Sequence, residues 1–391
     1  MDTYQRLLPP PLAVDDLASQ FRLPSHVAAS LHGSSPTSSR SASPDTEEAQ
    51  RTSPAAMAMS SKPGAAVDPE VVLAHKFPEV SFAYDEREVA LYALGVGACG
   101  SDAVDDKELH FVYHRDGQPH IKVLPTFVSL FPNKNSNGVG AVDVPGLNFD
   151  ASLLLHGQQY IEIYKPIPSY ANVVNKVKVA GLHDKGKATI LELETTTSLK
   201  DSGETLCMNR STIYLRGAGG FSDSSRPYSY ANYPANQVSR ISIPNSPPSA
   251  ALLYRLSGDY NPLHSDPEIA QIAGFTRPIL HGLCTLGFAA RAVIKSFCNG
   301  EPTAVKSIFG RFLLHVYPGE TLATEMWLNG QKVHYQMKVK ERNRAVLSGY
   351  VLLKHIPSSL ETTEDRSSVD DGVCGASGGE TGHGDAHGEE N

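Results

Sequence analysis

The chain has 391 residues, of which 40% are hydrophobic and 19% charged, and this composition is typical of a globular protein with two or three domains. Its formal net charge of −8 resides in residues 361–391, which hold nine acidic residues and one basic residue, so the remainder carries 33 of each sign. We therefore expect no nucleic-acid partner, because the body lacks a basic excess, and no membrane span, because no apolar run approaches the roughly 18 residues that one needs.

Two terminal segments differ in composition from the body of the chain. Residues 1–65 are rich in Ser, Pro and Ala without periodicity, and residues 361–391 are acidic and rich in Gly. Such segments bury too little apolar surface to offset the entropy of ordering, so we expect both to be disordered extensions. The folded body then spans residues 66–360. The five cysteines are an odd number with no C-x-x-C spacing, which favours a reducing compartment.

The first part of the body predicts a short helix followed by strands. Apolar residues at positions 89, 91, 92 and 94 have helical spacing, and the helix is expected to end at Gly95 and Gly97. Strand-like runs follow at residues 110–114, 159–167, 175–199 and 205–217. The third run contains the turn sequence HDKGK, after which alternation resumes, so it predicts a long hairpin.

The second part begins with a loop-like stretch, residues 218–250, and continues into a helix and more strands. The helix is predicted at residues 283–297, because Leu283, Leu286, Ala290, Val293 and Phe297 share one face. Further strand-like runs are found at residues 309–328, 332–342 and 344–356.

The two parts resemble each other. Residues 92–95 (YALG) match residues 254–257 (YRLS), and residues 154–156 match residues 313–315 (both LLH), each expected to open a strand. On this alignment Gly97 takes the place of Asp259, so only the second copy carries the acid. The repeat predicts an α+β architecture in which each copy is a helix wrapped by an antiparallel sheet.

The chemistry concentrates in the stretch YRLSGDYNPLH, residues 254–264. It holds Asp259 and His264 among turn-forming residues, which indicates a defined backbone shape. We expect Asp259 to hold and deprotonate a water molecule, and His264 to orient that water and deliver its proton. Downstream, Gly282 lies at a helix start, where unpaired backbone N–H groups can stabilise a developing negative oxygen.

The whole stretch YRLSGDYNPLHSDPEIAQIAGFTRPILHGL resembles the signature of the enoyl-CoA hydratase 2 family. The resemblance implies a double hot dog fold, with a substrate-binding half (residues 66–235) and a catalytic half (residues 236–360). It implies R-specific hydration of trans-2-enoyl-CoA to (3R)-3-hydroxyacyl-CoA in fatty acid β-oxidation, with no metal or redox cofactor. An acyl-CoA is then the expected substrate partner, and the protein is expected to be an enzyme. A homodimer is a possible assembly.

The resemblance also assigns individual residues, matched position by position. The catalytic residues are Asp259, Asn261, His264 and Gly282. The substrate-binding residues are His156, Gly157, Lys185, Tyr260, Pro262, Leu263 and Phe312. His281 is expected to support the loop rather than to react.

Two alternatives to the hydratase remain. The segment before Ala251 is shorter than in the family, so a non-catalytic acyl-CoA-binding protein is one alternative. An acyl-CoA thioesterase is the other, although the Asp-x-Asn-Pro-x-His string argues against it. For location, residues 358–360 (SSL) resemble a peroxisomal targeting tripeptide, but 31 residues follow it and such a signal is read at a free C-terminus. A peroxisomal location is expected, with the cytoplasm as the alternative.

Overall fold

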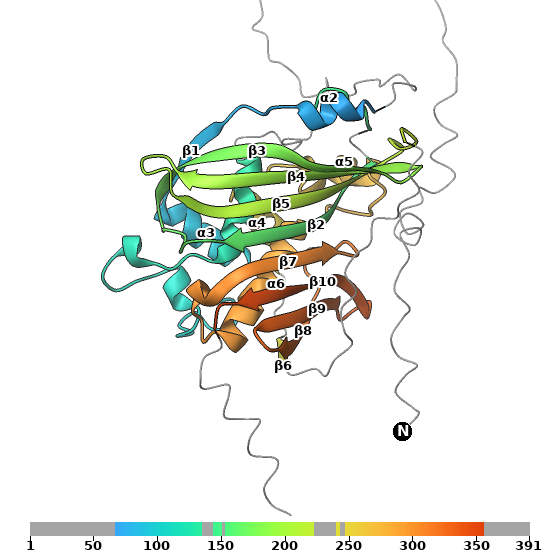
Figure 1. Ribbon diagram of the computed structural model, residues 1–391. Helices are drawn as coiled ribbons and strands as arrows, with labels where there is room; N and C mark the ends of the chain where they lie inside the picture. Colours follow the sequence, from blue (N-terminus) through green and yellow to red (C-terminus); the bar gives the residue numbers. More distant parts are fainter. Residues whose placement is uncertain (1–66, 135–143, 151–152, 223–239, 243–246, 356–391) are drawn as a thin grey trace, which may run out of the picture.

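The computed structural model describes residues 67–134, 144–150, 153–222, 240–242 and 247–355 (Figure 1). The two extensions expected to be disordered, residues 1–65 and 361–391, lie outside the described residues. The tripeptide at residues 358–360 also lies outside them. Within the described ranges, no helix is long and apolar enough to cross a membrane.

The described residues form one antiparallel sheet in the order β1-β3-β4-β5-β2-β7-β10-β9-β8-β6 (Figure 1). The first five strands are β1 (Val80–Tyr84), β2 (Leu154–Ile163), β3 (Ala171–Asp184), β4 (Ala188–Leu199) and β5 (Thr205–Arg216). The other strands are β6 (Arg240–Ser242), β7 (Val305–Phe312), β8 (Leu322–Asn329), β9 (Lys332–Val339) and β10 (Arg344–Leu353). The order 1-3-4-5-2 repeats as 6-8-9-10-7, which confirms the predicted duplication.

The two copies meet at the pair β2–β7, where Gln158 is opposite Arg311 and Glu162 is opposite Ser307. Because this pair is antiparallel, the start of β2 lies beside the end of β7. The expectation that residues 313–315 open a strand is therefore wrong, because β7 already ends at Phe312. The match between residues 92–95 and 254–257 fits the topology, since α3 (Glu86–Gly95) follows β1 and α4 (Ala250–Arg255) follows β6.

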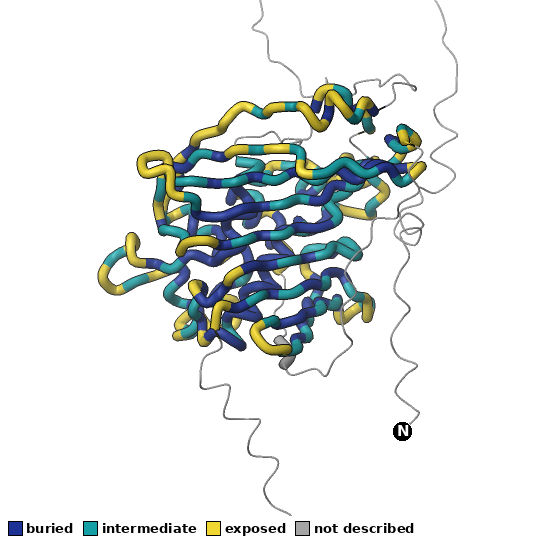
Figure 2. Tube along the Cα trace, viewed as in Figure 1, coloured by how far each residue is buried: buried dark blue, intermediate teal, exposed yellow. Residues whose placement is uncertain are grey.

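The sheet of the second copy wraps around α6 (Gly282–Phe297), which begins one residue before the predicted helix. Nearly every residue of α6 is buried, as expected for a helix enclosed on all sides rather than one with a single apolar face. The helix lies close to the sheet, because a Cβ atom on Gly310 of β7 would lie 2.7 Å from Leu286. Figure 2 shows the burial concentrated in the central strands and in this helix.

The first copy carries a shorter element in the corresponding place. Its sheet packs on η4 (Pro125–Asn133), a 3-10 helix with a proline inside it. Buried amides tie η4 to the strands, because Asn175 of β3 donates to the Phe131 carbonyl and Asn209 of β5 donates to the Val128 carbonyl. The architecture is an α+β double hot dog whose two copies enclose unequal helices.

Two local predictions have different outcomes. The hairpin at residues 183–187 is confirmed, because β3 ends at Asp184, β4 begins at Ala188 and Gly186 adopts a φ of +75° in the turn. The strand expected at residues 110–114 is wrong. That segment contains the 3-10 helix η2 (Leu109–Phe111), whose neighbouring amides pair locally, as in the bond from the Val112 N–H to the Leu109 carbonyl. A short apolar run of this kind does not distinguish a strand from a helical turn by its periodicity.

The remaining short helices of the described ranges are α2 (Pro69–Ala74), η3 (Gln118–His120), η7 (Pro262–His264), α5 (Pro267–Ile272) and η8 (Pro302–Ala304). Elements β6 and α4 have 3 and 6 residues, whereas their counterparts β1 and α3 have 5 and 10. The helix just before the loop that carries Asp259 is thus shorter than its counterpart in the first copy.

Candidate active site

The loop between α4 and η7 is fixed by its own polar groups. The chain turns at Gly258, whose φ of +118° favours glycine. The Asp259 carboxylate accepts a hydrogen bond from the Asn261 N–H (3.3 Å), and the Asn261 side chain accepts one from the Leu263 N–H (3.0 Å). Arg255 of α4 donates to the Asn261 carbonyl (3.2 Å). These bonds hold the loop in one shape although the segment before it is short.

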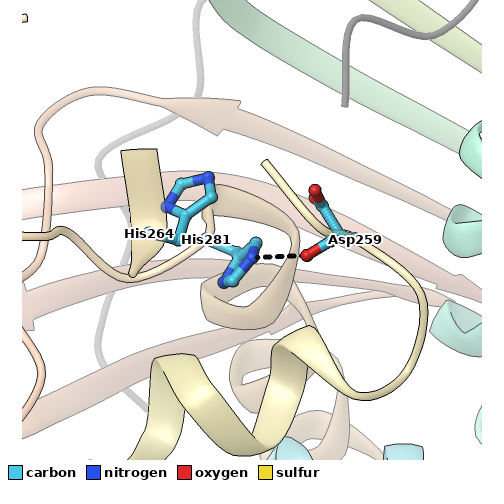
Figure 3. A group of neighbouring side chains, drawn as sticks. All are labelled: Asp259, His264 and His281. Atoms are coloured by element: carbon cyan, nitrogen blue, oxygen red, sulfur yellow. Dashed lines mark hydrogen bonds between the residues drawn. The ribbon is translucent and has the colours of Figure 1, made fainter. Parts of the chain in front are cut away.

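Two imidazole rings lie together beside Asp259 (Figure 3). The rings of His264 and His281 stack with centroids 3.7 Å apart and an interplanar angle of 29°. Nδ1 of His264 lies 2.9 Å from the Ile279 carbonyl, and Nε2 of His281 lies 3.2 Å from the Asp259 carbonyl. A carbonyl oxygen can only accept, so both of these nitrogens carry hydrogen. In the neutral rings the lone pairs are therefore on Nε2 of His264 and on Nδ1 of His281.

Both imidazoles are held in the neutral form. Burial lowers the pKa of His264, and the nearby Asp259 carboxylate offsets this only in part. Burial and the adjacent His264 hold the pKa of His281 well below its ordinary value. A neutral His264 with a lone pair on Nε2 is a proton acceptor at neutral pH.

Asp259, His264 and His281 also form a set of residue types that bind transition metals. Their ligand atoms all lie within 4.8 Å of one another. However, Nε2 of His281 is committed as a donor to the Asp259 carbonyl, and its Nδ1 is fully buried. His281 therefore suits a supporting role better than that of a metal ligand, and the same geometry of carboxylate and imidazole can hold a water molecule.

A cavity of about 320 Å³ opens beside this pair, a size in the lower range of ligand pockets. It brings together eight of the residues predicted for the site, namely Asp259, Asn261, Leu263, His264, Gly282, His156, Gly157 and Phe312. Tyr260 and Pro262 do not line it. Half of the surface of Tyr260 is exposed, and Pro262 begins the 3-10 helix η7, in which Leu263 and His264 face the cavity.

Lys185 also does not line the cavity. It lies in the β3–β4 hairpin, where its N–H donates to the Ala188 carbonyl. Through β5, which pairs with both β4 and β2, the hairpin is at the same end of the sheet as Leu154. Lys185 thus lies near the β2 end of the site but outside its lining.

The wall formed by the first copy depends on an irregularity in β2. The pairing of β2 with β5 shifts between His156 and Gln158, so Gly157 lies at a bulge. His156 donates from Nε2 to the Gln158 carbonyl (3.0 Å), and its ring packs edge-on against Phe312 (5.0 Å). Bulges of this kind redirect a side chain next to an active site.

Gly282 opens α6 at the cavity wall. His281, the N-cap, makes no side-chain cap to the first turn, so the leading N–H groups of the helix are not occupied by it. A Cβ atom on Gly282 would lie 3.2 Å from two ring carbons of Phe312. The close approach of backbone and ring explains why glycine occupies this position.

Several cavity or site residues were not predicted from the sequence. Arg311 and His315 line the cavity from the end of β7 and the segment after it. Tyr254 packs its ring against His281 with centroids 4.8 Å apart. Tyr254 opens the motif at residues 254–264 and so had a signal, whereas Arg311 could be found only from the β2–β7 register.

Comparison with known proteins bears on what this site does. Two family models match, the MFE-2 hydratase 2 N-terminal domain over residues 82–217 and the MaoC like domain over residues 230–349. The chain is 63% identical over 301 residues to the peroxisomal enoyl-CoA hydratase 2 of Arabidopsis thaliana, which covers 74% of this chain and 97% of that protein.

Two further relatives are more distant. Peroxisomal multifunctional enzyme type 2 of Mus musculus is 38% identical over 304 residues, covering 75% of this chain but 39% of that longer protein. Among solved structures, the MaoC-like dehydratase of Phytophthora capsici is 33% identical with a TM-score of 0.65, covering 74% of this chain and 99% of that one.

Proposed function

The chain belongs to the enoyl-CoA hydratase 2 family, and from this premise we propose that it adds water reversibly to trans-2-enoyl-CoA to form (3R)-3-hydroxyacyl-CoA. The reaction belongs to fatty acid β-oxidation. The observation that carries the proposal is the grouping of the Asp259 carboxylate and the His264 imidazole in a cavity wall that also includes the first residue of α6.

The reaction begins with a water molecule held by the two side chains. The Asp259 carboxylate and the Nε2 lone pair of His264 are both acceptors, so each takes one O–H of the water. The lone pairs of the oxygen then remain for attack on C3 of the substrate. Holding the nucleophile in this way replaces an encounter in solution with a fixed geometry.

The tautomer of His264 determines where the proton goes. Because its Nδ1–H is bound to the Ile279 carbonyl, neutral His264 can deliver a proton from Nε2 only after accepting one there. Water attacks C3 and gives one proton to Nε2, while the C2=C3 electrons move onto the thioester oxygen. The imidazolium, stabilised by Asp259, then returns that proton to C2, and the thioester carbonyl forms again. This assigns the first proton transfer to His264, whereas the sequence had suggested Asp259.

The negative thioester oxygen needs a donor, and Gly282 is placed to supply one. Its N–H is at the start of a 16-residue helix, where the helix dipole favours negative charge. Losing one such donor typically lowers kcat by about 10²–10³-fold. No metal or redox cofactor is needed for these steps.

The remainder of the cavity suits an acyl thioester. Apolar residues from both copies line it, including Leu155, Leu193, Ile213, Leu283 and Val346. We propose His156, Gly157, Leu263 and Phe312 as contacts for the substrate, and Lys185, Tyr260 and Pro262 as contacts for parts of the CoA that lie outside the cavity.

The alternatives are a thioesterase and a non-catalytic acyl-CoA-binding protein. One observation argues against the second alternative. Although α4 is short, Arg255 still binds the loop of Asp259, and Asp259 lines the cavity. A peroxisomal location is proposed because relatives in a plant and an animal are named as peroxisomal enzymes. A homodimer is proposed as the assembly.

The test is incubation of the full chain with a medium-chain trans-2-enoyl-CoA, followed by chiral analysis of the product. We expect loss of the enoyl absorbance and formation of the R alcohol. Release of free thiol would favour a thioesterase, binding without loss of absorbance would favour the non-catalytic protein, and an S product would contradict the proposal.

A further inference from the structure

His281 connects two parts of the site that are far apart in sequence. It is 1% exposed and directly precedes α6, and its Nε2–H donates to the carbonyl of Asp259, 22 residues earlier. The His281 ring contacts two other rings, that of His264 with centroids 3.7 Å apart and that of Tyr254 with centroids 4.8 Å apart. Figure 3 shows the two histidines and Asp259.

We propose that His281 is a positioning residue for the reaction, a role that rests on the proposed hydration. Its hydrogen bond fixes the backbone of Asp259 relative to the first turn of α6, and its stacking fixes the plane of the His264 ring. The distance from the held water to the N–H of Gly282 would then depend on His281, although His281 itself transfers no proton.

The loop needs such an anchor because its turn is weakly packed. At Gly258, a Cβ atom would have no neighbour within 4 Å, so this turn is open to its surroundings. Tyr260 is half exposed, and Arg255 contributes bonds within the same segment of chain. By contrast, the bond from His281 ties the loop to a buried helix, and a displacement of 1 Å at a reacting group can cost about 10²-fold in rate.

The electrostatic surroundings suit a neutral His281. The charged or titratable groups that face the two rings are Asp259 from the loop, Arg255 and Tyr254 from α4, and each ring for the other. Burial and His264 keep the pKa of His281 well below 6.5, and its Nδ1 has no partner among the described residues. A neutral His281 leaves His264 as the only imidazole in the pair that takes up a proton.

Two substitutions separate the hydrogen bond from the stacking. His281→Gln retains an N–H donor near the position of Nε2 but removes the aromatic ring. His281→Phe retains a ring for stacking but removes the donor. His334→Phe, at a buried histidine of β9 outside the cavity, is the matched control for loss of an imidazole.

We expect His281→Phe to lower kcat about 10- to 100-fold with KM changed less than about threefold, because the bound substrate meets a displaced Asp259. His281→Gln should recover most of kcat. Without the stacked ring, however, His264 is less shielded from water, and the acid limb of its pH–rate profile should move towards pH 6.5. His334→Phe should leave kcat and the profile unchanged.

Other results would overturn the proposal. If both variants lose thermal stability but keep the wild-type kcat, His281 has only a structural role. If both variants lower kcat to the same extent and the residual activity has no acid limb, His281 transfers a proton itself. Hydrogen exchange of the loop around Asp259 gives a readout without substrate, and it should rise in His281→Phe but not in His281→Gln. A wild-type protein that hydrates nothing, with this exchange pattern intact, would refute the proposed function and leave the anchoring role standing.

Discussion

Substitution of Gly282 by alanine tests the oxyanion site through a single added methyl group. The new Cβ would lie 3.2 Å from Cδ1 and Cε1 of Phe312, whereas carbon atoms in favourable contact are about 3.5–4.0 Å apart. The ring or the first turn of α6 must therefore move by a few tenths of an ångström. Since a misplacement of 1 Å costs about 10²-fold, a shift of roughly half that size should lower kcat about 10-fold.

Gly282→Ala should not lower the stability of the fold, although it should lower kcat. Alanine is favoured over glycine within a helix by up to about 1 kcal/mol, so the thermal unfolding midpoint should stay the same or rise. The assay is the initial rate of loss of enoyl absorbance over a range of substrate concentrations, with unfolding followed by circular dichroism. In a Phe312→Leu background, where the crowding ring is gone, the effect of Gly282→Ala on kcat should shrink. A wild-type kcat in the single variant, or a loss of kcat that follows a loss of stability, would refute the reasoning.

Three further predictions concern the charged and titratable groups. Asp259→Ala and His264→Ala should each lower hydration by at least about 10²-fold while the circular dichroism spectrum is retained, and wild-type-like turnover would remove the assignment. Because the folded pKa values of His264 and His281 lie below the unfolded value, the unfolded chain binds more protons below about pH 6.5, so the unfolding midpoint should fall as the pH is lowered from 7 to 5. Glu108→Gln breaks a buried ion pair with Arg291 and should cost about 3–5 kcal/mol in a denaturant titration, whereas an effect under about 1 kcal/mol would show that the pair is dispensable.

The sequence predicted which polar side chains lie together at the cavity, because the motif specifies their residue types in a fixed order. The order of Asp259, Asn261 and His264 among turn-forming residues indicated a fixed loop, and the apolar pattern after Gly282 indicated a buried helix at the right place. The structure has η7 at the first and α6 at the second. What the sequence could not predict was the proposed direction of proton transfer. That direction depends on a bond from His264 to the backbone carbonyl of Ile279, and every residue offers such a carbonyl.

The errors in the predicted fold have a related cause. Residues 110–114 are rich in residues that favour strands, but strand formation requires a partner, and these amides pair within their own turn. The first copy was expected to enclose a helix like α6, whereas η4 begins at Pro125 and contains Pro132, and proline cannot donate to a helical hydrogen bond. Local pattern alone did not reveal which segments would find partners.

The duplication explains why the cavity draws on both copies. Strands β2 and β7 are equivalent in the repeat, yet they pair with each other in antiparallel orientation at the junction. The pairing brings the first residues of β2, with His156, against the last residue of β7, Phe312. The start of β2 and the end of β7 thus form one wall of the cavity. An alignment that matches β2 with β7 therefore cannot match His156 with Phe312. The match of residues 154–156 with 313–315 was misleading as homology, although both segments line the same cavity.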